Sequence, residues 1–233
     1  QTMCAFWQAK PCLKYIFFGG KGGVGKTVLA AATGIWLSEQ SKKTILVSTN
    51  PVHSLSGLLC QDVFGKETLV CGTKLLAVEI DTKETIVKKK NEIREKIEWF
   101  LRYADISAQK TEDFVESATM NPAFEESAMF ERMVDLMFED KFDVYVFDTA
   151  PTANARRLLG MSKVYTLWVE KMLSSREEAA EMRKKLSVTK TDEKDPLLDY
   201  LLDFRSRIER VHKLLTDSEL TAFFFVTLAE ALP

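Results

Sequence analysis

The stretch that decides the fold is Phe17-Phe18-Gly19-Gly20-Lys21-Gly22-Gly23-Val24-Gly25-Lys26-Thr27-Val28. It contains the phosphate-binding pattern G-x-x-x-x-G-K-[ST] from Gly20 to Thr27. The apolar run 15–18 before the pattern predicts a buried strand, and residues 28–37 after it predict a helix. This strand–loop–helix context is the one that the pattern requires, so we expect a nucleotide-binding loop here.

The residue types of this loop suit a bound nucleoside triphosphate. Its glycines let backbone N–H groups turn toward phosphate oxygens, where a Cβ would block the approach. Lys26 is expected to reach the β- and γ-phosphates and the Thr27 hydroxyl to hold Mg²⁺, so the expected cofactors are ATP and Mg²⁺. The predicted nucleotide-binding residues are Gly20, Lys21, Gly22, Gly23, Val24, Gly25, Lys26, Thr27 and Val28.

Length and composition are those of a soluble globular protein. The chain has 233 residues, of which 46% are hydrophobic and 28% charged, and its net charge is −2. This balance argues against a nucleic-acid partner. No apolar run approaches the roughly 20 residues that span a bilayer, and the N-terminus does not read as a signal peptide. We expect a single P-loop ATPase domain over 1–233 in the cytoplasm.

The four cysteines are Cys4, Cys12, Cys60 and Cys71, and none is paired in a C-x-x-C spacing. A reducing compartment is expected for a soluble nucleotide-binding protein, so isolated thiols are the simpler interpretation. A soft-metal site built from Cys60 and Cys71 is the alternative.

Strands and helices alternate along the chain. Further apolar strands are predicted at 44–48, 75–80, 144–148 and 221–228, and helical segments at about 83–138 and 154–215 form a predicted helical subdomain. Alternation of this kind predicts an α/β fold with a parallel sheet and right-handed crossovers, as in P-loop NTPases. Ligands of such sheets bind beyond the carboxyl ends of the strands.

Two further strand ends carry candidate site residues. Asp148 ends an apolar strand, as does the acid that supports Mg²⁺ in P-loop NTPases, and Asn50 follows another strand and is the candidate for orienting the attacking water. A neutral amide orients water but is a poor base. His53 is either a loop hydrogen-bonder or a participant in catalysis. The residues predicted to switch with the γ-phosphate are Pro51, His53, Thr149 and Pro151.

Methionines gather in one predicted helix that begins at Asn121-Pro122. Methionine is common on surfaces that bind varied apolar partners, which favours a groove for hydrophobic clients. The alternative is a helix buried inside its own subdomain. The candidate groove residues are Met120, Phe124, Met129, Met133 and Met137, with a second wall from Met161, Leu167, Trp168, Met172 and Leu173.

Three motifs together resemble the ArsA-type ATPases, a family that includes the arsenite-pump ATPase and the ATPase that delivers tail-anchored membrane proteins. They are the loop 19–27, the segment Ser48-Thr49-Asn50-Pro51-Val52-His53-Ser54-Leu55-Ser56, and Phe147-Asp148-Thr149-Ala150-Pro151-Thr152. The segment 121–126 is similar to the family's helix start in the insertion. The extra lysine, Lys21, is the mark of "deviant" P-loop ATPases.

The resemblance implies a homodimer in which Lys21 contacts the partner's nucleotide, with Lys21 and Asn50 as catalytic residues. It implies that ATP closes the dimer and joins the helical insertions into one apolar groove. In the targeting branch, that groove shields the hydrophobic helices of membrane-protein clients, and a membrane receptor accepts the complex. We expect this chain to belong to that branch.

The sequence departs from the family pattern in three places. Asn50 stands where relatives carry Asp, which predicts slow hydrolysis. The family domain continues beyond the final strand, so its C-terminal part is expected to be missing. A zinc-binding C-x-x-C pair is absent. Two alternatives stay open: an arsenite-stimulated ATPase of an efflux pump, and a binding switch that scarcely hydrolyses ATP.

Overall fold

The computed structural model describes residues 3–50, 52, 54–103, 122–149, 170, 174, 181 and 196–228. The chain divides into two compact units. The first contains 1–155 and 218–233, and the second contains 156–217. Of the second unit, the structure describes helix α8 (Pro196–Thr216) and the helical residues Glu170, Ser174 and Glu181. The first unit holds the sheet and every site discussed below.

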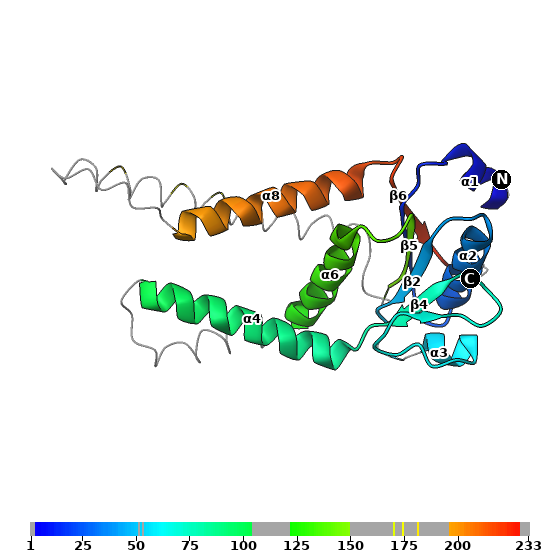
Figure 1. Cartoon of the computed structure of the whole chain (residues 1–233), viewed down its shortest axis with the longest axis horizontal. Coiled ribbons are helices and arrows are strands. Elements are labelled where there is room, and N and C mark those ends of the chain that lie inside the picture. The colour runs from blue at the N-terminus through cyan, green and yellow to red at the C-terminus, as the bar shows by residue number, and fades with distance from the viewer. Residues whose placement is uncertain are drawn as a thin grey trace, which may run out of the picture. The chain divides into compact units, whose positions relative to one another are not determined.

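Six strands form one sheet in the first unit, in the spatial order β3-β4-β2-β5-β1-β6 (Figure 1). The strands are β1 (Tyr15–Gly19), β2 (Thr44–Ser48), β3 (Thr68–Leu69), β4 (Leu76–Glu79), β5 (Val144–Asp148) and β6 (Thr221–Phe225). All pairings are parallel except that of β3 with β4. The predicted α/β fold with a parallel sheet is confirmed.

The central strands are buried along their whole length because helices cover both faces of the sheet. Every residue of β1, β2 and β5 is buried, as expected for parallel strands with near-continuous apolar sequence. Helix α2 (Lys26–Glu39) packs on β1, β2 and β5. Helix α6 (Pro122–Glu139) lies on the opposite side of the sheet (Figure 1).

Helix α4 (Thr82–Tyr103) packs along α6. The two helices are tied by an ion pair between Lys89 and Glu131. Asp81 precedes α4 and accepts a hydrogen bond from the backbone N–H of Glu84 at 3.0 Å, which caps the helix start. Residues 104–121 lie outside the described part of the chain, so the predicted helical insertion is seen as these two helices.

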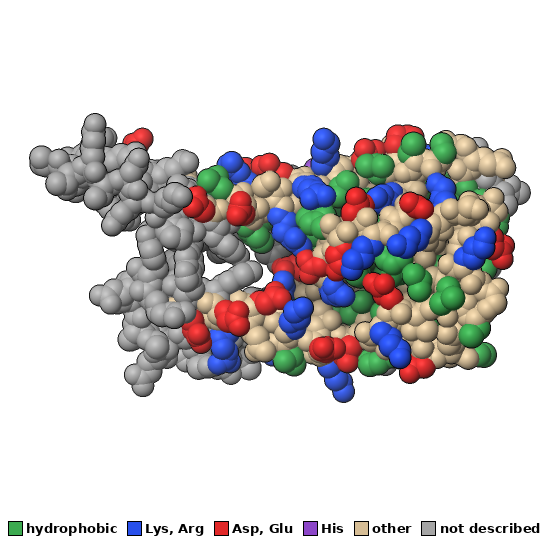
Figure 2. All heavy atoms as spheres, in the orientation of Figure 1, with side chains coloured by type: hydrophobic (Ala, Val, Ile, Leu, Met, Phe, Trp, Pro, Cys, Tyr) green, Lys and Arg blue, Asp and Glu red, His purple; other side chains and the backbone are tan. Residues whose placement is uncertain are grey.

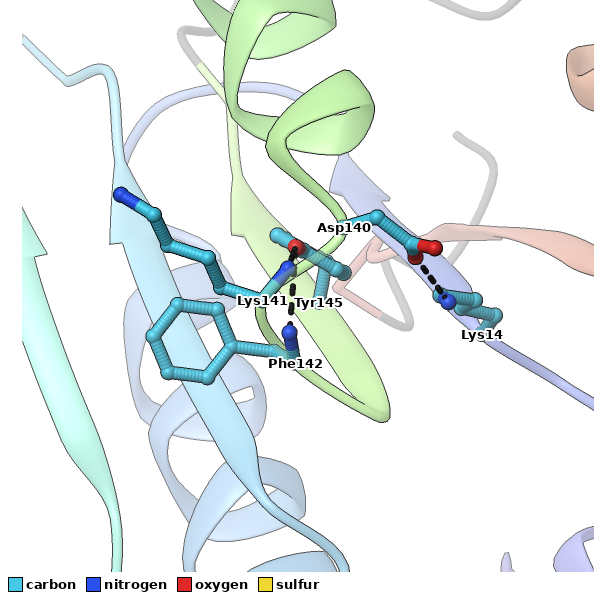
Figure 3. A network of polar contacts seen from close by, with 5 residues as sticks. All are labelled: Lys14, Asp140, Lys141, Phe142 and Tyr145. Atoms are coloured by element: carbon cyan, nitrogen blue, oxygen red, sulfur yellow. Dashed lines mark hydrogen bonds and ion pairs between the residues drawn. The ribbon is translucent and has the colours of Figure 1, made fainter.

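A polar network around Tyr145 stabilises the amino-terminal end of β5 (Figure 3). The Tyr145 hydroxyl accepts hydrogen bonds from the backbone N–H groups of Lys141 at 2.9 Å and Phe142 at 3.3 Å. Lys14, next to the start of β1, forms an ion pair with Asp140. The turn between α6 and β5 is thereby fixed to the sheet.

Two elements were not predicted from the sequence. Helix α1 (Met3–Ala9) packs Trp7 against Trp36 of α2, with the rings stacked at 6.5 Å, and against Phe224 of β6 at 5.9 Å. Strand β3 is only two residues long. The last strand also ends earlier than predicted, at Phe225. Val226 follows it and donates its N–H to the Gly19 carbonyl at 2.9 Å.

Candidate nucleotide-binding site

The carboxyl ends of β1, β5 and β2 are adjacent, so the three sequence motifs meet at one edge of the sheet. Phe18 pairs with Asp148 in the register of β1 and β5, and Asp148 pairs with Ser48 in the register of β5 and β2. Beyond the strands, the Thr149 N–H donates to the Phe18 carbonyl at 3.1 Å and the Thr49 N–H to the Asp148 carbonyl at 3.0 Å. The loops that leave these strands therefore start from fixed positions.

Glycine is required at several positions of the loop between β1 and α2. Gly20 has φ 138°, and a Cβ there would lie 2.3 Å from the Val226 carbonyl oxygen. Gly23 and Gly25 have φ values of 77° and 90°, in the left-handed region that side chains disfavour. The loop thus adopts backbone conformations that glycine tolerates and other residues disfavour.

Helix α2 begins at Lys26 with Gly25 as its N-cap, and no side chain caps its first turn. The first N–H groups of a helix lack intrahelical acceptors and carry the positive end of the helix dipole. An anion is the natural partner for such a terminus. The fold therefore directs backbone donors toward the space that the loop encloses.

The two loop lysines have different environments. Lys26 is 5% exposed, and its Nζ donates to the Lys21 carbonyl at 3.0 Å, so its ammonium group lies across the loop. Lys21, Gly22 and Gly23 are exposed. The buried cation belongs to the loop interior, where phosphate charge would be neutralised, whereas the Lys21 side chain is accessible from outside.

Thr27 and Asp148 are joined directly. The Thr27 hydroxyl donates to Oδ2 of Asp148 at 2.8 Å, and the Ser48 hydroxyl donates to the same oxygen at 3.3 Å. Burial raises the pKa of the Asp148 carboxyl, while the bonds from Thr27 and Ser48 and the charge of Lys26 act in the lowering direction. The carboxylate is therefore costly to ionise without a further positive charge.

The other oxygen of Asp148 indicates where such a charge would fit. Oδ1 is buried and has no hydrogen-bond partner among the residues that the structure describes. A buried acceptor without a partner carries a desolvation cost that a cation or its water would remove. Thr27 and Asp148 together present hydroxyl and carboxylate oxygens, which are the ligands that Mg²⁺ prefers. The predicted metal residues thus fit the predicted ion.

Asn50 enters the same network through Ser54. The Asn50 amide nitrogen lies 3.4 Å from the Ser54 hydroxyl oxygen, which lies 3.4 Å from the Thr27 hydroxyl oxygen. Since the single Thr27 hydroxyl hydrogen is directed at Asp148, the Ser54 hydroxyl must donate to Thr27 and accept from Asn50. The result is a directed chain of hydrogen bonds from Asn50 through Ser54 and Thr27 to Asp148.

The loop that carries Asn50 is itself held by this side chain. The Asn50 Oδ1 accepts from the Val52 N–H at 3.2 Å, which forms a local turn. The Asn50 N–H donates to the Ser48 hydroxyl at 3.3 Å. Val52 is 76% exposed. The amide is thus anchored at the mouth of the site. Its role in catalysis remains a prediction.

The structure describes one of the four predicted switch residues, Thr149. Thr149 is buried, and its hydroxyl donates to the Phe18 carbonyl at 2.8 Å. Pro51, His53 and Pro151 lie outside the described residues.

The predicted client-groove residues of α6 are buried in this structure. Exposed fractions are 8% for Phe124, 9% for Met129, 2% for Met133 and 1% for Met137. They form core contacts here, which is the arrangement that the alternative interpretation anticipated. Met120 and the predicted second wall lie outside the described residues.

Sequence reasoning did not assign an individual role to Ser48, Ser54 or Glu79. Ser54 begins helix α3 (Ser54–Leu59) and forms the contacts given above. Glu79, at the end of β4, is 1% exposed. The one available signal is its position: like Ser48 and Asp148, it is a polar residue at the carboxyl end of an apolar strand.

Other kinds of site find less support. Cys12, Cys60 and Cys71 are exposed thiols. Among the described residues, no three His, Cys, Asp or Glu side chains gather closely enough to hold a metal ion. None of the described helices combines the length and apolar character needed to cross a membrane. On the face shown in Figure 2, basic and acidic side chains are interspersed, so that face presents no field of a single sign.

Comparison with known proteins gives a consistent result. The sequence matches the family model described as "Anion-transporting ATPase" over residues 13–233. A protein of Aquifex aeolicus (strain VF5), named "Putative arsenical pump-driving ATPase 2", is 32% identical over 223 residues, which cover 95% of this chain and 72% of that protein.

Two eukaryotic relatives are similar at the same level. "ATPase GET3C" of Arabidopsis thaliana is 30% identical over 232 residues, which cover 92% of this chain and 59% of that protein. "ATPase ASNA1 homolog 2" of Paramecium tetraurelia is 33% identical over 168 residues, which cover 71% of this chain and 49% of that protein. The chain thus spans between 49% and 72% of the length of these three relatives.

Proposed function

This chain is an ATPase of the anion-transporting ATPase family, and we propose that it uses ATP to capture and release the hydrophobic helices of membrane proteins, such as tail-anchored proteins. Relatives with the names GET3 and ASNA1 and relatives named as arsenical pump ATPases are similar to it at nearly equal identity. The choice between these branches therefore depends on features of the chain itself.

The observation that carries the proposal is the continuity of the segment 122–148. Its first part is α6, which carries Met129, Met133 and Met137, and its last residue is Asp148, which contacts Thr27 of the phosphate-binding loop. A shift of Asp148 on ATP binding would act directly on the strand that follows the methionine helix. A helix rich in adaptable apolar side chains is suited to clients of varied sequence.

The chain's own residues supply the parts that phosphoryl transfer needs. Lys26 and the uncapped start of α2 would bind the phosphates, and Thr27 and Asp148 would hold Mg²⁺, which neutralises developing charge when bound. Asn50 would orient the attacking water. Because an amide accepts a proton poorly, we propose that hydrolysis is slow and that the ATP-bound state is long-lived.

The client surface requires a change from the present arrangement, since Met133 and Met137 are almost fully buried. We propose that a homodimer forms on ATP binding, with the exposed Lys21 reaching the partner's nucleotide, and that α6 then exposes part of its apolar side. Exposed hydrophobic helices aggregate in water, so a groove that covers about 20 apolar residues would keep a client soluble. We propose that this occurs in the cytoplasm, before transfer to a membrane receptor.

The decisive experiment uses the full-length protein and a fluorescent peptide of about 20 apolar residues. The peptide is mixed with the protein and Mg²⁺, with ADP or with a non-hydrolysable ATP analogue, and soluble complex is measured by gel filtration. We expect co-elution with the ATP analogue and release with ADP. The matched control is Lys26→Ala, which should abolish the difference between the two nucleotides. A peptide of the same length with four central lysines controls for apolar recognition.

The arsenical-pump alternative predicts a different result. In that case arsenite raises steady-state ATP turnover several-fold, and the apolar peptide does not bind in either nucleotide state. The names of relatives such as the Aquifex protein support this alternative. Against it, the described cysteines form no cluster with other metal-binding side chains. A binding switch would show peptide capture with ATP but negligible turnover.

A further inference from the structure

Glu79 is a buried carboxylate that the nucleotide chemistry described above does not use. It ends β4, which is separated in the sheet by β2 and β5 from the strand that leads into the phosphate-binding loop, and it is 1% exposed. Burying a carboxylate is costly unless its oxygens accept hydrogen bonds. Both oxygens of Glu79 do so, and both bonds come from one residue: the Ser56 N–H donates to Oε1 at 2.8 Å and the Ser56 hydroxyl donates to Oε2 at 3.0 Å.

These bonds attach the first turn of α3 to the sheet. Ser56 follows Ser54 by two residues, and Ser54 is the residue that joins Asn50 to Thr27. The Ser56 hydroxyl also accepts from the Val63 N–H at 3.2 Å, which ties down the chain after α3. The position of Ser54 in the site is thus set by a residue outside the site.

The backbone of Glu79 extends the same attachment. Its N–H donates to the Val63 carbonyl at 2.8 Å, and its carbonyl accepts from the Gly65 N–H at 2.8 Å. The next residue, Ile80, donates to the Ser48 carbonyl at 2.9 Å, and the one after it, Asp81, caps α4. Helix α4 in turn holds α6 through Lys89 and Glu131.

From this arrangement we propose that Glu79 is a positioning residue that couples the nucleotide site to helix α4. Its carboxylate holds the first turn of α3, and with it Ser54 and Asn50, in place against Thr27. Movement of that turn when the nucleotide changes is passed through Glu79 to the start of α4. The inference rests on the proposed ATPase function and names the residue by which the site would act on the helices.

A carboxylate suits this role because both of its oxygens accept charge-assisted hydrogen bonds, which are roughly twice as strong as neutral ones. Glu79→Gln keeps the size of the side chain but removes the charge, and its NH₂ group can bond only to the Ser56 hydroxyl, which must then reverse to accept. Both bonds to Ser56 are thereby weakened. Ser56→Ala keeps the carboxylate and the bond from the backbone N–H, but it removes the hydroxyl bond and the acceptor of the Val63 N–H.

The test measures hydrogen exchange of the full-length protein with and without a non-hydrolysable ATP analogue and Mg²⁺. In the wild type we expect the nucleotide to slow exchange in the loop 20–27 and to change exchange in 54–63 and 82–92. In Glu79→Gln we expect protection of 20–27 to persist, while the response of 82–92 falls at least threefold. Ser56→Ala should give an intermediate response.

The kinetic readout separates positioning from general damage to the fold. Glu79→Gln should lower kcat for ATP hydrolysis while KM for ATP stays within twofold, because the phosphate-binding loop is untouched. A displacement of about 1 Å in a site costs roughly 100-fold, so a loss of about 10- to 100-fold is expected. The matched control is Asp62→Asn, between α3 and β3, because the Asp62 carboxylate accepts from the Phe64 N–H rather than from α3.

Each outcome has a defined meaning. A wild-type response at 82–92 in Glu79→Gln would overturn the coupling, and so would a wild-type protein that protects 20–27 but shows no response in 82–92. Failure of the nucleotide to protect 20–27 in the wild type would instead contradict the proposed ATP binding. If Glu79→Gln does not fold, Ser56→Ala decides, and a full response at 82–92 in that variant would contradict the proposal.

Discussion

Thr27 and Asp148 are 121 positions apart in the sequence, yet the hydroxyl of one donates to the carboxylate of the other at 2.8 Å. The contact exists because β1 and β5 are neighbours in the sheet and end in register. It joins the first turn of the phosphate-binding helix to the acid of a different motif. The unpartnered Oδ1 of Asp148 next to it makes this pair the expected position of the metal ion.

Replacement of Asp148 should weaken Mg²⁺ binding more than nucleotide binding. In Asp148→Asn the carboxylate charge is lost while the shape is kept, so we expect Mg²⁺ affinity to fall about 10- to 100-fold, as for other residues that support metal ligands. The measurement is titration of ATP turnover and of fluorescent ATP binding with Mg²⁺. Asp143→Asn is the control, because Asp143 precedes the opposite end of β5 and accepts from the Lys43 N–H. Equal effects in both variants would argue against a metal role.

Restoring an acid at position 50 should speed hydrolysis. In Asn50→Asp, the carboxylate can accept the proton of the attacking water and can also accept from the Ser54 hydroxyl, which reverses the hydrogen bond seen with the amide. A positioned general base contributes about 100- to 10,000-fold, so we expect a rise in kcat of at least about 10-fold. Steady-state phosphate release measures it, with Asn50→Ala as control. An unchanged or lower rate would mean that a group other than residue 50 positions the attacking water.

Gly20→Ala should destabilise the protein although only a methyl group is added. The new Cβ would lie 2.3 Å from the Val226 carbonyl oxygen, and the residue would keep a φ of 138° that side chains rarely adopt. Strain of this kind costs about 1–3 kcal/mol, and displacement of Val226 adds to it. Gly57→Ala is the matched control, because its Cβ meets nothing within 4 Å. Chemical denaturation should show a loss for the first variant and no loss for the second.

Tyr145→Phe should cost stability by an amount that depends on pH. The variant leaves the N–H groups of Lys141 and Phe142 without their acceptor, at about 1–3 kcal/mol for the buried donor of Phe142. Burial raises the pKa of the Tyr145 hydroxyl in the folded state, against the lowering effect of these hydrogen bonds. Above a pH of about 10, the unfolded chain therefore loses this proton first, and the wild type loses stability as pH rises.

The difference in unfolding free energy between wild type and Tyr145→Phe should thus be largest near neutral pH and shrink above a pH of about 10. Urea denaturation at neutral pH and at a pH above about 10 measures this difference. A difference that stays constant across this range would contradict the raised pKa of the buried Tyr145 hydroxyl, whose two hydrogen bonds are drawn in Figure 3.

Much of the fold followed from the sequence because the central strands are apolar and buried on both faces. The limits of β2 and β5 agree with the predicted ones, since each is a short β-branched or aromatic run between polar turns. Helix α1 was missed because it is only seven residues long, with no acidic residue in its first turn and no basic residue in its last, and it packs on α2 and β6 through Trp7. Strand β3 was missed because two residues carry no periodicity.

Site residues that belong to a sequence motif could be predicted. Those whose role depends on a contact in the folded chain could not. The loop 20–27 and Asp148 were assigned from spacing and strand position. The roles of Ser54 and Glu79 depend on side chains 4 to 27 positions away, such as Asn50, Thr27 and Ser56, and composition does not reveal such pairs. For the methionines, the sequence shows that they cluster in one helix. It does not show whether a partner or the protein's own core covers them.

The stacked indoles of Trp7 and Trp36 give the chain an internal optical reporter. Two indoles held 6.5 Å apart with planes inclined by 30° couple their electronic transitions, which produces a circular dichroism signal that an isolated indole lacks. Trp7 belongs to α1, which precedes the region matched by the family model, and Trp36 belongs to the helix that starts at the phosphate-binding loop. The docking of this additional helix can therefore be followed during unfolding or nucleotide binding without attaching a dye.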